Sequence, residues 1–463
     1  MKIGFIAAAA LFLASCTTAS MTEVAGRRAA PAESLPTMKT FSSKGLSAPR
    51  GHRVRRSNKD IARDFLDLTF QMESGRRIER MSRFEGPIRI ALVNGRSPGV
   101  VQDLDALIAR LRREAGIDIT RTGRAAEANI IVEMVPARQM RRLVPQAACF
   151  VVPTVSGWEE FKRFRRSSRI DWTRLDQRRR AAVFIPLGVA PQEVRDCLHE
   201  EIAQALGPLN DLYRLPDSVF NDDNFHSVLT PFDMLVLRAY YAPELHSGMT
   251  RAQVARVLPT ILDRINPAGR GLPAHGVAAA DRAWIDAIER AMSRGTSRNA
   301  RISAARKAVA LARNAGWQDN RLAFSLFAYG RVALATEPDG AIAAFAEANR
   351  IFRGRYGAGI QAAHVDLQLA GLALSSGQAD TAIRLADRCV PAVMAEQNAA
   401  LLATLLMIKA EALDLKGRST EARAVRLDSL GWARYGFGSE ELVRQRLQEI
   451  SALAPELGRP GTL

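Results

Sequence analysis

Apolar residues change their spacing several times along the first half of the chain. Ile61, Phe65, Leu68 and Met72 recur at the spacing of one helical face. Apolar and alternating runs then predict strands at residues 87–93, 117–120, 129–135 and 181–187, and helices at residues 101–115 and 191–206. Strands mixed with helices in this order predict an α+β domain over residues 57–259.

The second half, residues 281–463, has almost no strand signal. Ala and Leu recur there at helical spacing, and stretches that begin at Gly330, Ala370 and Lys409 can be superposed. Each stretch reads as a helix, a short turn and a second helix, which resembles a tetratricopeptide-type repeat of longer period. Stacked helix pairs form a concave groove that binds extended peptides or partner proteins. The alternative is a helical bundle packed against the first domain.

Two stretches lack apolar periodicity. Residues 260–280 are rich in Pro, Gly and Ala, which is typical of a linker. Residues 16–56 are rich in Ala, Ser, Thr, Pro and Arg, which predicts a flexible tether.

The chain begins with Lys2, an apolar run and then Leu13-Ala14-Ser15-Cys16. Residues 1–15 resemble a bacterial lipoprotein signal peptide, and the run is too short to span a membrane. The resemblance implies that Cys16 is the lipidated first residue of the mature chain. Because Thr17, rather than Asp, follows it, we expect a lipid anchor in the outer membrane, facing the periplasm. An ordinary secretory signal is the alternative.

The chain is strongly basic, with 65 Lys and Arg against 48 Asp and Glu and a formal net charge of +17. An anionic partner must therefore be considered. The densest basic run, residues 162–169 followed by 178–180, lies among Phe161, Phe164 and Trp172. Cations among aromatic rings are typical of nucleic-acid binding. A periplasmic protein instead meets lipid phosphates, and a solvated loop is the simplest interpretation.

Three cysteines remain once Cys16 carries a lipid. In an oxidising compartment Cys149 and Cys197 are the natural disulfide pair, because both belong to the first domain. Cys389 lies on an apolar helix and is expected to be a buried thiol.

The helix at residues 191–206 carries the most informative motif, C-L-H-E-E-I-A-Q-A-L-G-P-L-N-D from 197 to 211. It resembles the metzincin pattern H-E-x-x-H-x-x-G-x-x-H, in which three His ligate zinc and the Glu acts on its water. The resemblance implies that Glu201 is the general base. It places Glu200, Gln204 and Asn210 at the three ligand positions, so all three imidazoles are missing.

Downstream residues support this alignment. Residues 218–221 resemble the turn that carries a Met beneath the metal, and Phe220 stands at the Met position. A second alignment, starting from His199, puts Ala203 at a ligand position and gives Gly207 no role. An ordinary amphipathic helix remains a third interpretation.

Taken together, the chain resembles an uncharacterised bacterial lipoprotein family with an E-E-x-x-Q-x-L-G motif, a degenerate zincin-like domain followed by helical repeats. We expect an inactive, pseudo-metalloprotease domain without cofactor or metal, in a protein that binds or scaffolds envelope proteins or peptides through the repeats. The alternative is a hydrolase with a rebuilt site at Glu200 and Glu201. We expect no nucleic acid and no small-molecule ligand.

Overall fold

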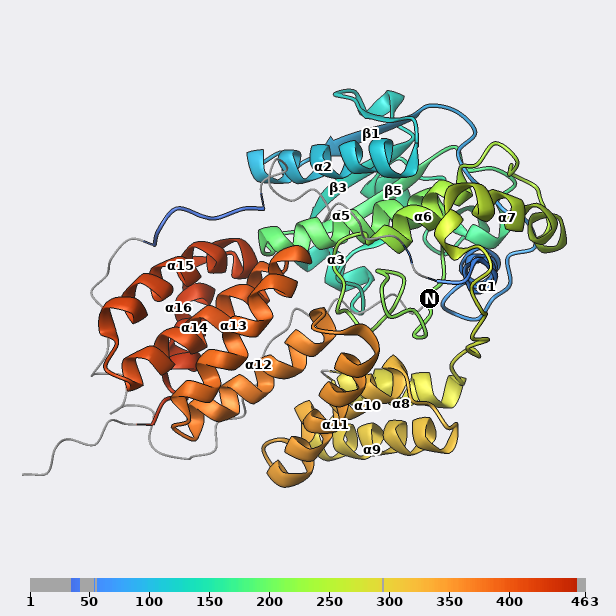
Figure 1. Cartoon of the computed structure of the whole chain (residues 1–463). Helices are drawn as coiled ribbons and strands as arrows, with labels where there is room; N and C mark the ends of the chain where they lie inside the picture. Colours follow the sequence, from blue (N-terminus) through green and yellow to red (C-terminus); the bar gives the residue numbers. More distant parts are fainter. Residues whose placement is uncertain (1–34, 42–53, 55, 294, 456–463) are drawn as a thin grey trace, which may run out of the picture. The chain divides into compact units, whose positions relative to one another are not determined.

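The computed structural model describes residues 35–41, 54, 56–293 and 295–455, which form two compact units (Figure 1). The α/β unit comprises residues 54 and 56–279. The helical unit comprises residues 35–41 together with the described residues from 280 onward. Cys16 and the predicted signal peptide lie outside the described residues.

The α/β unit contains a five-stranded sheet in the order β2-β1-β3-β5-β4. The pairs β1–β2, β1–β3 and β3–β5 are parallel, whereas β4 is antiparallel to β5. The strands are β1 (Ile88–Val93), β2 (Ile119–Arg121), β3 (Ile130–Pro136), β4 (Phe150–Pro153) and β5 (Ala181–Leu187). The helices are α1 (Asn58–Phe70), α2 (Pro98–Arg110), α3 (Ala137–Leu143), α4 (Trp158–Phe164), α5 (Pro191–Leu206), α6 (Pro231–Tyr240) and α7 (Arg251–Ile265).

The two faces of the sheet carry separate cores, because successive side chains of a strand point to opposite faces. On one face, strand residues such as Val132 and Val183 pack with apolar residues of α2 and α5 in the main core. The other face carries Phe150 and Phe184, which cluster with Trp158 and Phe161 of α4. The α5 helix therefore lies against one side of the sheet.

Helix α7 continues beyond the predicted end of the first domain. A linker is predicted at residues 260–280, directly after Pro259, but α7 runs through this proline to Ile265. A proline inside a helix removes one backbone hydrogen bond. The helix persists because Val254, Leu258, Ile261 and Leu262 are buried along one side of it.

The helical unit consists of helix pairs. Helices α10, α12 and α14 begin at Asn320, Ile360 and Ala399, close to the forty-residue spacing of the superposed stretches. This region is all-helical, as the sequence predicts, and its helices are α8 (Arg282–Met292), α9 (Arg298–Asn314), α10 (Asn320–Ala333), α11 (Pro338–Tyr356), α12 (Ile360–Ser375), α13 (Ala379–Ala395), α14 (Ala399–Leu415), α15 (Ser419–Phe437) and α16 (Glu440–Ser451).

Paired helices approach closely where one of them carries a small residue. Gly330 of α10 faces Phe345 of α11, where a Cβ atom would lie only 2.6 Å from the ring. Ala333, Ala373 and Ala412 are also buried. Small residues at these positions therefore set the spacing of the pairs.

Part of the predicted tether is docked. Residues 35–41 belong to the helical unit and lie along α15, so the expected flexible stretch of 16–56 is interrupted by an ordered segment. Its backbone and side chains contact α15, which a composition-based prediction cannot foresee. Among the described residues, no helix has the length and apolar character needed to cross a membrane.

Candidate functional site

Helix α5 is held at its C-terminal end by a buried arginine. Arg178 donates hydrogen bonds to the backbone carbonyls of Gln204 (2.6 Å), Ala205 (2.8 Å) and Gly207 (2.6 Å). These are carbonyls that a helix end leaves without partners. Gly207 is needed because a Cβ atom there would lie 3.0 Å from the Tyr240 ring. The motif helix therefore ends at a defined place against α6.

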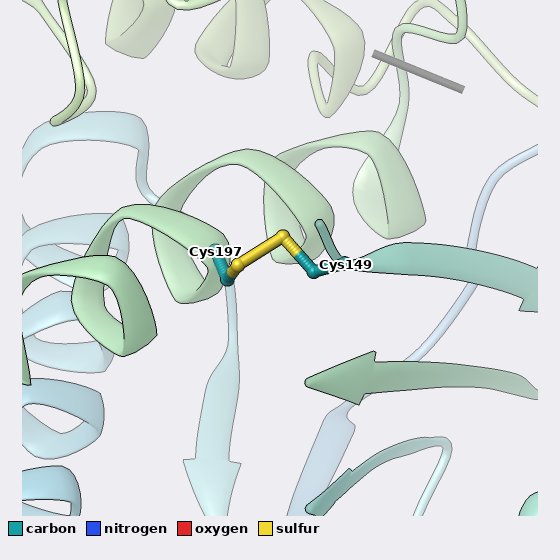
Figure 2. The surroundings of a disulfide bond; sticks show 2 residues. All are labelled: Cys149 and Cys197. Atoms are coloured by element: carbon teal, nitrogen blue, oxygen red, sulfur yellow. A yellow bond between two sulfur atoms is a disulfide. The ribbon is translucent and has the colours of Figure 1, made fainter. Parts of the chain in front are cut away.

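A disulfide fixes the same helix to the sheet. Cys149 and Cys197 are bonded, with an S–S distance of 2.11 Å and a Cα–Cα distance of 6.0 Å (Figure 2). Cys149 directly precedes β4 and belongs to the core beneath α5. The bond therefore links the start of β4 to the middle of α5.

The histidine of the motif has a structural partner. His199 is buried, and its Nδ1 accepts a hydrogen bond from the Leu229 backbone N–H at 3.1 Å. Burial, together with the nearby Arg110 and Arg195 charges, lowers the pKa of His199 well below its ordinary value. The imidazole is therefore neutral at physiological pH and serves to hold the segment before α6.

Carboxyl groups gather around the middle of α5. Glu201 is 4% exposed, and no described residue offers a hydrogen bond to its Oε2. Burial, and then the charge of Asp211, raises the pKa of Glu201 to about 8. Burial likewise raises the pKa of Asp211 to about 6, an effect that the neighbouring Glu73 partly opposes.

Two further carboxyls extend the cluster. Burial, and then Glu201, Asp211 and Asp222, raise the pKa of the partly exposed Glu200 well above its ordinary value. Burial and Asp211 do the same for Glu73. Carboxyl groups this close together resist ionising at the same time, and Glu201, whose pKa is raised to about 8, keeps its proton near neutral pH. The arrangement can offer both a proton donor and a proton acceptor.

The other two degenerate ligand positions do not join this cluster through hydrogen bonds. Asn210 donates from its side-chain amide to the Asp67 backbone carbonyl of α1 at 3.0 Å. Gln204 is buried, and its backbone carbonyl accepts a hydrogen bond from Arg178. Of the residues that the metzincin alignment singles out, Glu200 and Glu201 therefore lie in the carboxyl cluster. Asn210 instead links the loop after α5 to α1.

The turn at the Met position is fixed against α6. Phe220 is fully buried; its backbone N–H donates to Ser218 Oγ at 3.0 Å, and its carbonyl accepts from Leu212 at 2.9 Å. Asp233 of α6 accepts hydrogen bonds from Ser218 Oγ and the Val219 N–H. Phe220 therefore fills the core.

Sequence reasoning missed Glu73, which lies in the loop after α1, far from the motif and without any local pattern. The basic run divides between the surface and the core, because Lys162 and Arg179 are exposed whereas Arg178 is not. Arg178 is buried under the end of α5, and Phe161 and Trp172 are buried as well. Phe164 is only partly buried, and the Arg169 guanidinium lies 4.2 Å from the centre of its ring.

No group of three or more His, Cys, Asp or Glu side chains in the described residues has an arrangement suited to a metal ion. The carboxyl cluster is therefore a set of neighbours rather than a formed ligand cage.

Comparisons with known proteins give little beyond the first unit. No curated protein matches the chain. The crystal structure of BtubC (BKLC) from P. vanneervenii matches 39% of this chain and 76% of its own, at 14% sequence identity and a TM-score of 0.25, a level that supports no conclusion about fold or function. Residues 58–260, which span α1 to most of α7, match a family described as a protein of unknown function (DUF2927), so the α/β unit corresponds to an uncharacterised domain.

Proposed function

We propose that the α/β unit is a zincin-like domain without zinc catalysis. The protein would then act as a lipid-anchored binding or scaffolding module, facing the periplasm, that captures a protein or peptide through its helical repeats. The proposal rests on the chemistry of α5, on the order of elements before it and on the paired helices of the second unit.

The order of elements supports the zincin-like part. The sequence runs from β1 through α2 to further strands and then from β5 directly into α5, which lies against one face of the sheet. This is the arrangement that the resemblance implies for the upper half of a zincin domain.

The observation that carries the proposal is the occupation of the ligand positions. Zinc sites of this type use neutral imidazoles at fixed helical spacing. Here Glu200 and Gln204 replace two of them, and the Asn210 amide is engaged by the Asp67 carbonyl. His199, the only imidazole of α5, holds the Leu229 N–H. Without a metal, Glu201 has no activated water to deprotonate.

The helical unit supports the binding role. Its helix pairs recur at nearly constant spacing, with small residues between paired helices. Repeats of this kind stack into extended surfaces that bind peptides or proteins. Such a surface needs no reacting group, so it fits a protein whose motif helix has lost its imidazoles.

Metal analysis of the purified mature protein tests the proposal, with peptide hydrolysis measured on the same sample. We expect zinc far below one equivalent, because none of the three ligand positions carries an imidazole, and no cleavage. Glu201→Gln serves as the matched variant, because it keeps the shape of the side chain. Stoichiometric zinc together with peptidase activity that Glu201→Gln abolishes would refute the pseudoenzyme.

One observation favours a second candidate, a hydrolase with a rebuilt carboxylate site. The pKa values of Glu201, about 8, and Asp211, about 6, leave one acid protonated and the other ionised near pH 7. A proton donor beside a proton acceptor is what general acid and base catalysis requires. A bell-shaped pH profile of hydrolysis that both Glu201→Gln and Asp211→Asn abolish would support this candidate.

A further inference from the structure

Residues 35–41 form an extended segment beside α15, where Figure 1 draws it in dark blue. The backbone N–H of Lys39 donates to the Gly431 carbonyl at 2.9 Å. The Arg434 guanidinium donates to the Pro36 carbonyl at 2.7 Å. Two hydrogen bonds to the segment's own backbone fix its register along the helix.

Side chains add contacts of two kinds. The Phe41 ring lies 4.8 Å from the Trp432 ring and 6.4 Å from the Tyr435 ring, between centroids. Lys39 pairs with Asp428, and its ammonium lies 5.7 Å from the centre of the Trp432 ring. The helix thus offers an aromatic platform and a carboxylate to a cation and an aromatic residue two positions apart.

Gly431 shows that α15 is shaped for this contact. Glycine is a poor residue for the interior of a helix, yet Gly431 stands in the middle of α15. A Cβ atom at Gly431 would lie 3.0 Å from Cγ of Lys39, 3.3 Å from its Cδ and 3.4 Å from the Thr37 carbonyl oxygen. The missing side chain therefore makes room for the segment's close approach.

We propose that this face of α15, formed by Asp428, Gly431, Trp432, Arg434 and Tyr435, is a binding site for an extended peptide of the pattern cation, any residue, aromatic. Residues 36–41 occupy it as the chain's own, displaceable ligand. The contacts suit displacement: the ion pair is exposed on both sides, and the two backbone hydrogen bonds can be made by any extended peptide. A peptide with the same pattern would compete for the same surface.

The test uses the full chain and a fluorescent peptide that copies residues 34–43. Phe41→Ala weakens the internal ligand, so the peptide should bind this variant at least tenfold more tightly than it binds the unaltered chain, because an attached ligand competes at high effective concentration. Fluorescence anisotropy measures both affinities. A copy of the peptide with Ala in place of Phe should compete at least tenfold more weakly.

The glycine supplies the matched control. In the Phe41→Ala chain, a second change of Gly431→Ala should weaken peptide binding at least tenfold. Gly354→Ala, in a helix of the same unit where a Cβ atom meets nothing within 4 Å, should leave binding unchanged. Trp432→Ser repeats the test at the aromatic platform if Gly431→Ala disturbs folding, which circular dichroism would reveal.

Three outcomes would overturn the inference: no peptide binding to the Phe41→Ala chain, equal binding to the unaltered chain, or equal binding after both Gly431→Ala and Trp432→Ser. The inference goes beyond the proposed partner capture and does not depend on it, because the probe is the chain's own segment.

Discussion

Two buried carboxyl groups, one in each unit, have opposite surroundings. In the helical unit, the fully buried Asp366 of α12 accepts hydrogen bonds from Asn349 and Arg353 of α11 and from Arg388 of α13, at 2.8 Å for Arg388 Nε. In the α/β unit, the charged neighbour that acts on the buried Glu201 is another carboxyl. Asp366 is compensated by cations, whereas Glu201 lies beside another acid, although the α/β unit also contains a compensated acid, Asp64, which pairs with Arg214 at 2.8 Å.

This difference separates a structural role from a functional one. A compensated acid such as Asp366 joins three helices through its hydrogen bonds. Uncompensated acids with raised pKa values reduce stability, and they are typical of sites that bind or react. The acids around α5 therefore have the character of a functional site, even though α5 lacks the zinc-binding histidines of the metzincin pattern.

Removing the compensated acid should have the largest effect. Asp366→Asn leaves Arg353 and Arg388 without their carboxylate, and we expect a loss of about 3 to 4 kcal/mol in the free energy of unfolding of the helical unit. Urea titration measures it. Asp387→Asn, which breaks an exposed pair with Lys409, should cost less than about 1 kcal/mol. If both changes lowered the free energy of unfolding equally, Asp366 would not have the structural role described.

Removing the disulfide should affect the α/β unit alone. We expect Cys149→Ala with Cys197→Ala to lower the stability of that unit by about 2 to 4 kcal/mol, because the bond limits the conformations of the unfolded chain. Calorimetry shows which unit is affected, because only the unfolding transition of that unit shifts to a lower temperature. Cys389→Ala, in the helical unit, is the control and should move only the other transition. Peptide mapping that finds Cys149 and Cys197 as free thiols would contradict the prediction.

Removing the uncompensated acid should have a smaller effect of opposite sign. Because the pKa of Glu201 rises from 4.5 to about 8 on folding, the folded protein keeps a proton that the unfolded chain releases, and stability falls as pH rises between these values. Glu201→Gln removes this loss. We expect it to stabilise by about 1 to 3 kcal/mol at pH 8 and by little at pH 4.5.

Urea unfolding at the two pH values checks this sign. Glu440→Gln, at an exposed helix position, should change stability by less than about 0.5 kcal/mol at either pH. A Glu201→Gln variant that is less stable than the unaltered protein at pH 8 would mean that the carboxylate is compensated after all.

Separating the units should have the smallest effect. We expect residues 281–455, expressed alone, to remain soluble and helical, because this unit has its own buried core. Circular dichroism and calorimetry measure its helix content and its transition. An unfolded fragment would show that the helical unit depends on the rest of the chain.

Local patterns predicted the elements that have a regular period. The strands β1, β3 and β5 and the helix α5 follow from apolar spacing. The strand β4 was missed, because its four residues are all buried and so show no alternation. The end of α7 was missed because Pro259 looked like a stop, whereas tertiary burial keeps the helix intact.

The site was predictable only where its residues lie close together in the sequence. Glu200, Glu201 and Asp211 belong to one motif. The Cys149–Cys197 pairing could be predicted because both cysteines belong to the first domain. Glu73 joins them only through the fold. Arg178 was assigned to a surface patch, because a run of charges does not reveal which member turns inward to the carbonyls of α5.

The strand order also has a consequence for solubility. The outer strands of a sheet expose unpaired backbone groups to which another chain can add. Here the two outer strands, β2 and β4, have only three and four residues, and Pro153 of β4 has no backbone N–H to donate. A strand that joined at either edge would gain few hydrogen bonds. The sheet is thereby protected from edge-to-edge aggregation, even though its inner strands are long and apolar.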